Sequence, residues 1–183
     1  FNRQAAKVKA LENGRRDADH YFGCNPCSEI ILRPYQFCNL TEVVCRVTDD
    51  LVSLKEKVRM ATILGTLQST LTNFKYLRKI WKDNTEEERL LGVSLTGILD
   101  CPIWTEEILQ ILRDVAVETN KKLAKDLGIP QSTAITCVKP SGTVSQLVDS
   151  ASGIHARHND YYIRTVRGDN KDPITQFMKE SGI

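Results

Sequence analysis

Hydrophobic residues recur at spacings of three and four along one long stretch of the chain, residues 51–81. The series consists of Leu54, Val58, Ala61, Leu64, Leu67, Leu71, Phe74 and Leu77. This period places the apolar side chains along one face of a helix. Thr48, Asp49 and Asp50, just before it, supply turn and N-cap chemistry. We therefore expect a single long helix over residues 51–81, with Gly65 as the point where it would break.

A second amphipathic stretch covers residues 105–127. Thr105 suits the N-cap position, and two acids follow it in the first turn, where the helix dipole favours them. Gly128 then allows the left-handed conformation that ends many helices. Helices are also expected at both ends of the chain, over residues 1–11 and after Asp172-Pro173.

Short apolar or β-branched runs between the helices are typical of strands. They cover residues 43–47, 90–95, 132–138 and 161–167. Strands that alternate with helices indicate α/β units on a mostly parallel sheet. The sequence therefore predicts the α/β class.

Composition limits the choice of partner and compartment. The chain has 183 residues, 41% hydrophobic and 26% charged, an ordinary globular composition. A net charge of +2 argues against nucleic acid or a membrane surface as the main partner. No run approaches the roughly 18 apolar residues of a membrane span, and no apolar signal segment is visible. Six cysteines without such a signal favour a reducing, cytoplasmic compartment.

Both ends of the sequence resemble interior segments of a longer chain. It starts with Phe1 rather than Met and stops at Ile183, where a helix is ending. We expect it to be one part of a larger protein.

The densest chemistry lies in residues 22–40, which hold three cysteines. Cys24 and Cys27 form a C-x-x-C pattern, which suits zinc only with two further ligands and suits a redox pair at a helix start. Asn25-Pro26 is instead typical of a turn, and extended structure follows it. In the remaining interpretations Cys27 is a reactive thiol with Glu29 as acid/base partner and Cys38 as a second thiol, or the cysteines only pack.

A run of small residues, Lys139 to Ser145, leaves a predicted strand. Such a turn exposes backbone N–H groups that suit a phosphate, although an ordinary turn has the same composition. Residues 152–158 bring His155, Arg157 and His158 together, as a solvated loop or as a phosphate contact.

The other thiols and the tryptophans have no such neighbours in the sequence. Cys45, Cys101 and Cys137 lie in apolar surroundings and are expected to pack as buried hydrophobes. Trp81 and Trp104 are expected in the core, together with the other aromatic residues.

Several of these motifs, taken in order, resemble the adenosylcobalamin-dependent (class II) ribonucleotide reductases, above all the monomeric ribonucleoside-triphosphate reductases. The resemblance rests on Asn25-Pro26-Cys27-x-Glu29 followed by Cys38, and it runs through nearly the whole chain. The other matching stretches are residues 13–17, 31–40, 88–97, 139–145, 152–155 and 161–164.

The resemblance implies a fold and an arrangement of the chain. The family's catalytic domain is a ten-stranded α/β barrel with the radical cysteine on a central finger loop. Residues 1–183 would form the C-terminal half of that barrel, with a finger loop at 21–29 and a phosphate loop at 139–145. The remaining N-terminal part of the enzyme would complete it.

The resemblance also implies a reaction, the reduction of ribonucleotides to 2′-deoxyribonucleotides. Cys27 would become a thiyl radical with adenosylcobalamin as cofactor and take the 3′ hydrogen of the ribose. Glu29 would act as base on the 3′ hydroxyl, and Asn25 would hydrogen-bond the ribose hydroxyls. Cys38 would be one of two reducing thiols, its partner lying outside this chain. No metal ligands are implied within it.

Substrate and reductant follow from the same resemblance. The substrate phosphates would lie on the loop formed by Pro140, Ser141, Gly142, Thr143, Val144 and Ser145. Likeness to the monomeric group favours a ribonucleoside triphosphate over a diphosphate. Thioredoxin or a similar dithiol would reduce the enzyme after each turnover.

The sequence departs from the family pattern in three respects. At most about five strands fit into this chain. Ser28 stands where glycine is expected, and Cys24 adds a thiol three positions from Cys27. A thiol- or zinc-binding accessory module that uses Cys24 and Cys27 is therefore kept as the alternative. A glycyl-radical enzyme would need a C-terminal glycine loop, which is not seen here.

Overall fold

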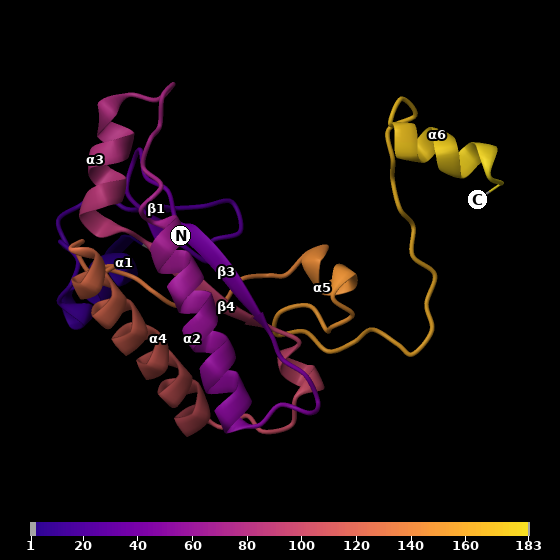
Figure 1. Ribbon diagram of the computed structural model, residues 1–183, viewed down its shortest axis with the longest axis horizontal. Coiled ribbons are helices and arrows are strands. Elements are labelled where there is room, and N and C mark those ends of the chain that lie inside the picture. Colours follow the sequence, from indigo (N-terminus) through magenta and orange to yellow (C-terminus); the bar gives the residue numbers. More distant parts are fainter. Residues whose placement is uncertain (1–2, 183) are drawn as a thin grey trace.

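The computed structural model describes residues 3–182, which fold as an α/β structure (Figure 1). In chain order the elements are α1 (Arg3–Asn13), β1 (Gly23–Cys24), β2 (Ile31–Leu32), β3 (Asn39–Val44), α2 (Leu51–Gln68), α3 (Lys79–Glu88), β4 (Leu91–Thr96), the 3-10 turn η1 (Ile98–Asp100), α4 (Glu106–Leu127), α5 (Val144–Leu147) and α6 (Pro173–Glu180). No helix among these is long and apolar enough to cross a membrane.

Two parallel strands form the centre of the fold. β3 and β4 pair in register from Asn39 opposite Leu91 to Val44 opposite Thr96. On the other side of β4 runs the segment of residues 134–137, where the Cys137 N–H donates to the Val93 carbonyl at 3.0 Å. A parallel bridge at Thr136 lies on this segment, so the predicted strand at 132–138 is present as a short extended segment.

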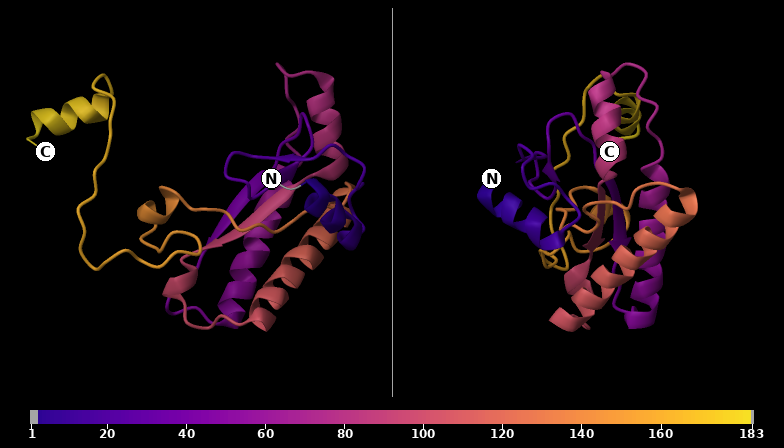
Figure 2. Two further views of the ribbon diagram at one scale, coloured as in Figure 1. Left: turned by 180° about the vertical axis from the view of Figure 1, so that it is seen from behind. Right: turned by 90° about the vertical axis from the view of Figure 1, so that its left-hand side faces the viewer.

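α2 and α4 lie side by side and cover one face of these strands (Figure 2). Side chains alternate between the two faces of a strand, so every second residue joins the core under the helices. The buried core consists of Val43, Cys45, Leu54, Val58, Ala61, Leu91, Val93, Cys101, Leu112, Ala116 and Ile135. The opposite face, called the open face below, carries Leu40 and Glu42 of β3 and Gly92 and Ser94 of β4.

The caps of the two core helices confirm several local predictions. The Asp50 side chain accepts a hydrogen bond from the Ser53 N–H at the start of α2, and the Ser53 hydroxyl oxygen accepts one from the Asp50 N–H. Thr105 accepts from the Ile108 N–H, and Gly128 ends α4 at φ 65°. The predicted C-terminal helix also forms, with the Asp172 side chain as its cap.

The single helix predicted over residues 51–81 is wrong. α2 ends at Gln68, and α3 begins ten residues after Ser69, at Lys79. The apolar period continues through this gap, but Phe74 packs on Phe37, with ring centroids 5.1 Å apart. Gly65 is no break either: a Cβ there would lie 2.5 Å from Leu91, so the glycine lets α2 approach β4 closely.

The strand predicted at residues 161–167 is also wrong. This segment has no regular structure, and Ile163 is 98% exposed because no strand pairs with it. It leads away from the body of the molecule to α6 (Figure 1). The expected strand at 43–47 lies earlier, at Asn39–Val44, and the one at 90–95 is confirmed as β4.

The aromatic residues are only partly in the core. Trp81 is half-buried and stacks on Phe37 at 4.7 Å, and Trp104 packs at the edge of the core. Tyr76 and Tyr161 are almost fully exposed, so the expectation that the aromatic residues are core is wrong for them. Among residues 3–182 the strands form two two-stranded sheets, and the half-barrel stays a prediction.

Candidate active site

A β-hairpin presents the thiol-rich stretch. β1 and β2 pair antiparallel, and residues 25–30 form the loop between them, called the hairpin loop below. The Ser28 N–H donates to the Asn25 carbonyl at 2.9 Å, and the Asn25 side chain accepts from the Ile30 N–H at 3.0 Å. Cys27 lies between these contacts with its side chain exposed. The loop therefore holds a thiol outward on a fixed turn.

Ser28 adopts the left-handed conformation, φ 65°, within this turn. A side chain costs energy there that glycine does not have. This agrees with the expectation of glycine at the position. The Ser28 hydroxyl lies 3.6 Å from the sulfur of Cys24, which forms the C-x-x-C pattern with Cys27.

The hairpin lies against the open face at Gly92. A Cβ at this glycine would lie 2.4 Å from Leu40, 3.0 Å from Ile30 and 3.2 Å from the sulfur of Cys137. Only glycine leaves room for all three side chains. β3, β4, the hairpin and the segment after residue 134 therefore meet on one surface.

Glu29 is the buried carboxylate of this surface. Its side chain is 1% exposed, Oε1 lies 3.5 Å from the Lys139 ammonium, and Oε2 has no hydrogen-bond partner among the described residues. Burial alone would raise the pKa of the Glu29 carboxyl. The nearby backbone N–H of Glu29, the Asn25 side chain and the charge of Lys139 instead hold this pKa below its ordinary value. Glu29 is thus an ionised base with one free oxygen.

Two thiols border Glu29. Burial raises the pKa of Cys38 to about 12, and the charges of Cys137 and Glu29 act in the same direction. Burial likewise raises the pKa of Cys137 to about 12, again with a contribution from Glu29. Both sulfurs are therefore held protonated at neutral pH.

The prediction that Cys137 packs as a buried hydrophobe is wrong, whereas Cys45 and Cys101 are buried in the core as expected. Cys137 is only half-buried and has charged neighbours. The sequence signal that could have found it is its spacing from Lys139. Residues two apart along an extended segment face the same side, so both face the hairpin.

The loop of residues 139–145 is fixed by its hydroxyl groups. The Ser141 hydroxyl donates to Glu42 at 3.3 Å, and the Ser145 hydroxyl donates to the Ser141 carbonyl at 3.1 Å. Within residues 3–182, no protein group accepts a hydrogen bond from the N–H of Gly142 or Thr143. A Cβ at Gly142 would meet nothing within 4 Å, so this part of the loop faces open space.

The segment that starts at Ser152 packs against this loop and holds it in place. The Ser152 hydroxyl hydrogen-bonds the Ser141 carbonyl. Gly153, at φ 55°, approaches so closely that a Cβ would lie 3.1 Å from the Lys139 carbonyl. His155 and His158 are exposed, as in the solvated-loop interpretation. The serine and the glycine of this motif thus hold the loop, and its Arg157 forms ion pairs with Asp100 and Asp149.

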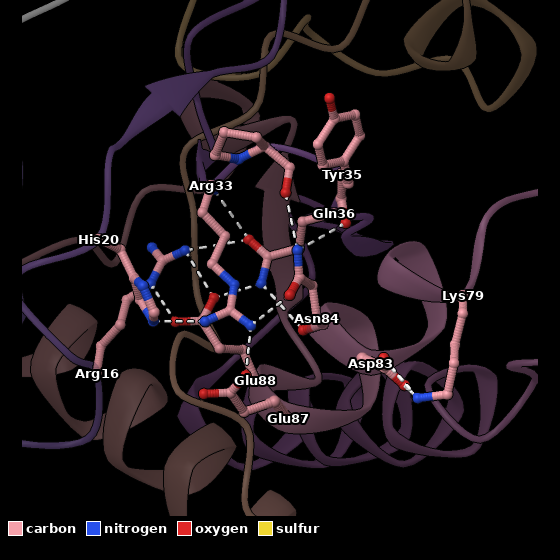
Figure 3. A network of polar contacts seen from close by, with 11 residues as sticks. Arg16, His20, Arg33, Tyr35, Gln36, Lys79, Asp83, Asn84, Glu87 and Glu88 are labelled. Atoms are coloured by element: carbon pink, nitrogen blue, oxygen red, sulfur yellow. Dashed lines mark hydrogen bonds and ion pairs between the residues drawn. The ribbon is translucent and has the colours of Figure 1, made fainter.

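A buried polar network anchors the hairpin to α3 (Figure 3). Arg16 binds both carboxylate oxygens of Glu88, at 2.8 and 2.9 Å, and donates to the Ile31 carbonyl at 2.8 Å. The other members are His20, Arg33, Gln36, Asn84 and Glu87. Breaking a buried ion pair of this kind is strongly destabilising, so the network fixes where the hairpin lies.

The expected site residues therefore separate into four groups. Glu29 and Cys38 come together on the open face, the 139–145 loop adjoins them through Lys139, and Cys27 stands exposed at the loop tip. The side chain of Asn25 contacts the hairpin itself. All six cysteines are free, and within residues 3–182 no three His, Cys, Asp or Glu side chains are grouped as metal ligands would be.

Comparison with known proteins finds reductases that are similar in sequence to this chain. No model of a protein family matches the sequence. The adenosylcobalamin-dependent ribonucleoside-triphosphate reductase of Lacticaseibacillus paracasei is 28% identical over all of this chain and 28% of its own length. A probable reductase of the same name from Dictyostelium discoideum is 30% identical over 87% of the chain and 21% of its own length. The chain is thus similar over most of its length to adenosylcobalamin-dependent ribonucleoside-triphosphate reductases.

A solved structure agrees with the sequence matches. The crystal structure of a B12-dependent (class II) ribonucleotide reductase aligns with a TM-score of 0.59 and 25% identity, covering 73% of this chain and 22% of that one. The family resemblance inferred from the motifs is thereby confirmed. The chain spans about a quarter of the length of the reductases it matches.

Proposed function

We propose that this chain is the C-terminal half of the catalytic barrel of an enzyme that reduces ribonucleoside triphosphates to 2′-deoxyribonucleotides through a thiyl radical. One observation carries the proposal. The hairpin loop sets an accessible thiol, Cys27, two residues from a buried and ionised carboxylate, Glu29, beside the protonated thiol of Cys38.

Two residues, Cys27 and Glu29, act in the first step of the reaction. The Cys27 sulfur, as a thiyl radical, takes the hydrogen atom from the 3′ carbon of the ribose and becomes a thiol. The free oxygen of Glu29 accepts the proton of the 3′ hydroxyl. The lowered pKa of Glu29 keeps that oxygen able to accept a proton at neutral pH. Asn25, which braces the loop, would also face the ribose hydroxyls.

The second step uses Cys38 and a thiol from the rest of the enzyme. The 2′ hydroxyl takes a proton from one thiol and leaves as water, and the 2′ carbon takes the hydrogen of the other thiol. The two sulfurs give up two electrons in all and end as a disulfide, and Glu29 returns its proton to the 3′ oxygen. The 3′ hydrogen then returns from Cys27, which restores the radical. A pKa of about 12 suits Cys38 to this role, because the thiol keeps its proton until the leaving group needs it. Thioredoxin or a similar dithiol would reduce the disulfide.

The substrate phosphates would lie on the loop from Pro140 to Ser145. Its free N–H groups at Gly142 and Thr143 face open space, as a phosphate site requires. The names of the relatives support a triphosphate as the substrate.

Adenosylcobalamin is the cofactor that the relatives' names imply. One feature of this chain fits so bulky a group: the Cys27 side chain is exposed at the tip of its turn and can be approached from outside. When bound, the cofactor supplies the one-electron chemistry that generates the radical. The residues of the hairpin loop would hold the Cys27 sulfur toward it. Six free cysteines suit the reducing cytoplasm.

A chimera tests the proposal. Residues 1–183 replace the matched quarter of the L. paracasei reductase, and reduction of ribonucleoside triphosphates is assayed with adenosylcobalamin and a dithiol. We expect turnover that disappears in Cys27→Ser and falls roughly 10²–10⁴-fold in Glu29→Gln, the usual range for loss of a general base.

Cys24→Ser is the matched control, because Cys24 is a thiol of the same hairpin with no assigned role. It should retain turnover. A folded chimera that is inactive, or one whose Cys27→Ser variant still reduces nucleotides, would count against the proposed reaction. Stoichiometric zinc bound by the chain and lost in Cys24→Ala would favour the accessory-module alternative instead.

A further inference from the structure

We infer that Lys139 is a positioning residue for the base Glu29: its ammonium pairs with this carboxylate and ties it to the phosphate loop. The inference rests on the proposed function, since it assigns a residue to the same site. The resemblance places the substrate phosphates on residues 140–145 of this loop and gives the Lys139 side chain no role of its own.

The ion pair is the structural basis. Lys139 Nζ lies 3.5 Å from Glu29 Oε1, and the two side chains are 29% and 1% exposed. Among the residues that the structure describes, no other cation lies within 4 Å of Glu29. A carboxylate so buried is costly unless a partner compensates its charge. Lys139 is that partner.

The lysine is itself held in place. Its backbone N–H donates to the Ser94 hydroxyl at 3.3 Å, and its carbonyl packs against Gly153. The phosphate-loop residue Pro140 follows directly. The ion pair therefore links the start of the phosphate loop to the carboxylate that acts on the ribose.

The other charged or titratable groups around Glu29 have different partners. Arg16 is bound to Glu88, and Glu42 accepts from Ser141. The thiols of Cys38 and Cys137 are uncharged at neutral pH because burial raises the pKa of each to about 12. The remaining cations line a cavity of about 200 Å³ that Glu29 also borders, and they are Lys9, Arg15 and Arg113. None of these three forms an ion pair with it.

The first measurement needs no activity. The 183-residue chain is labelled with ¹³C at the glutamate carboxyl carbons, and the Glu29 signal, assigned by its loss in Glu29→Gln, is titrated by NMR. Lys139→Met should raise the pKa of Glu29, and Lys139→Arg should restore the lower pKa. Lys139→Gln, which keeps a polar end, replaces the methionine variant if that one does not fold.

Lys57→Met is the matched control, because Lys57 of α2 forms a comparable ion pair, at 2.6 Å, with the mostly buried Asp49 in the turn before that helix. It should leave the Glu29 titration unchanged. A Glu29 pKa that is the same in folded Lys139→Met and in the parent chain overturns the inference.

The second measurement uses the chimera. A base with a lowered pKa works down to lower pH, so loss of Lys139 should move the acid limb of the kcat/KM profile to higher pH. Arginine should restore the limb, which a merely structural role would not do. If the NMR shift appears but the chimera reduces no nucleotide, the proposed function fails and the ion-pair role stands. An unshifted acid limb in an active Lys139→Met chimera overturns the positioning role.

Discussion

The two faces of the β3–β4 pair are built from alternate residues of the same strands, yet they differ in polarity and charge. Under α2 and α4, Val43, Leu91 and Val93 are buried with apolar partners. On the open face, Glu42 and Ser94 are joined by Glu29 and Lys139 from other segments.

The difference shows in the kind of buried group that each face leaves without a partner. On the helix face this is the hydroxyl of Thr41, which lies against Gly65 of α2. On the open face, Glu29 Oε2 and Glu42 Oε1 are buried and lack hydrogen-bond partners among the described residues. Buried oxygens of this kind are costly and are kept where another group is to meet them. Stability and chemistry are thus assigned to opposite faces by a period of two.

The largest effect that we expect on the open face is a reduced reactivity of its thiol groups. At pH 8 a thiol with a pKa of about 12 is ionised to roughly one part in ten thousand, against about one in ten for an ordinary pKa of 9.0. In the folded chain, Cys137 should therefore react with iodoacetamide about a thousandfold more slowly than in urea. Its rate should rise about tenfold per pH unit, since only the thiolate reacts. Peptide mass spectrometry follows each cysteine.

Cys45 of the helix face is the internal control. It is fully buried, so it should react only through unfolding. If Cys45 and Cys137 were modified at the same rate and with the same pH dependence, the open face would be no more accessible than the core.

The sequence predicted those parts of the fold that local signals determine. α4 begins and ends as expected because Thr105 and Gly128 act on their own helix. The stretch 51–81 could not be predicted in this way. Its period runs on past Gln68, but Phe74 packs against Phe37, and no local pattern reveals a partner so far away in the chain.

The site residues, too, include some that a local motif reveals and one that it does not. Cys27, Glu29 and Cys38 could be named because the motif places them within twelve residues of each other. Lys139 lies 110 positions from Glu29, and their contact exists only because β4 and the hairpin bring the two segments together. The half-barrel stays a prediction, because each of the two sheets among the described residues contains two strands.

The next prediction tests which face carries the stability. Leu112 of α4 is 3% exposed in the core between the helices and the strands. Leu112→Ala should therefore lower the free energy of unfolding by about 2–5 kcal/mol. Glu42→Gln keeps its shape on the open face and weakens one hydrogen bond, so it should cost less than about 1 kcal/mol. Urea denaturation followed by circular dichroism measures both. Equal losses would mean that the open face is also part of the stabilising core.

The smallest effect concerns the turn that holds Cys27. Ser28 has φ 65°, which costs a non-glycine residue roughly 1–2 kcal/mol, while glycine loses about 0.5–1 kcal/mol through its freer unfolded chain. Ser28→Gly should therefore stabilise the chain by up to about 1 kcal/mol, and Ser28→Ala, which keeps the Cβ, should not. Thermal denaturation of the two variants decides this. A loss of stability in the glycine variant would mean that the Ser28 hydroxyl, 3.6 Å from the Cys24 sulfur, holds the turn instead.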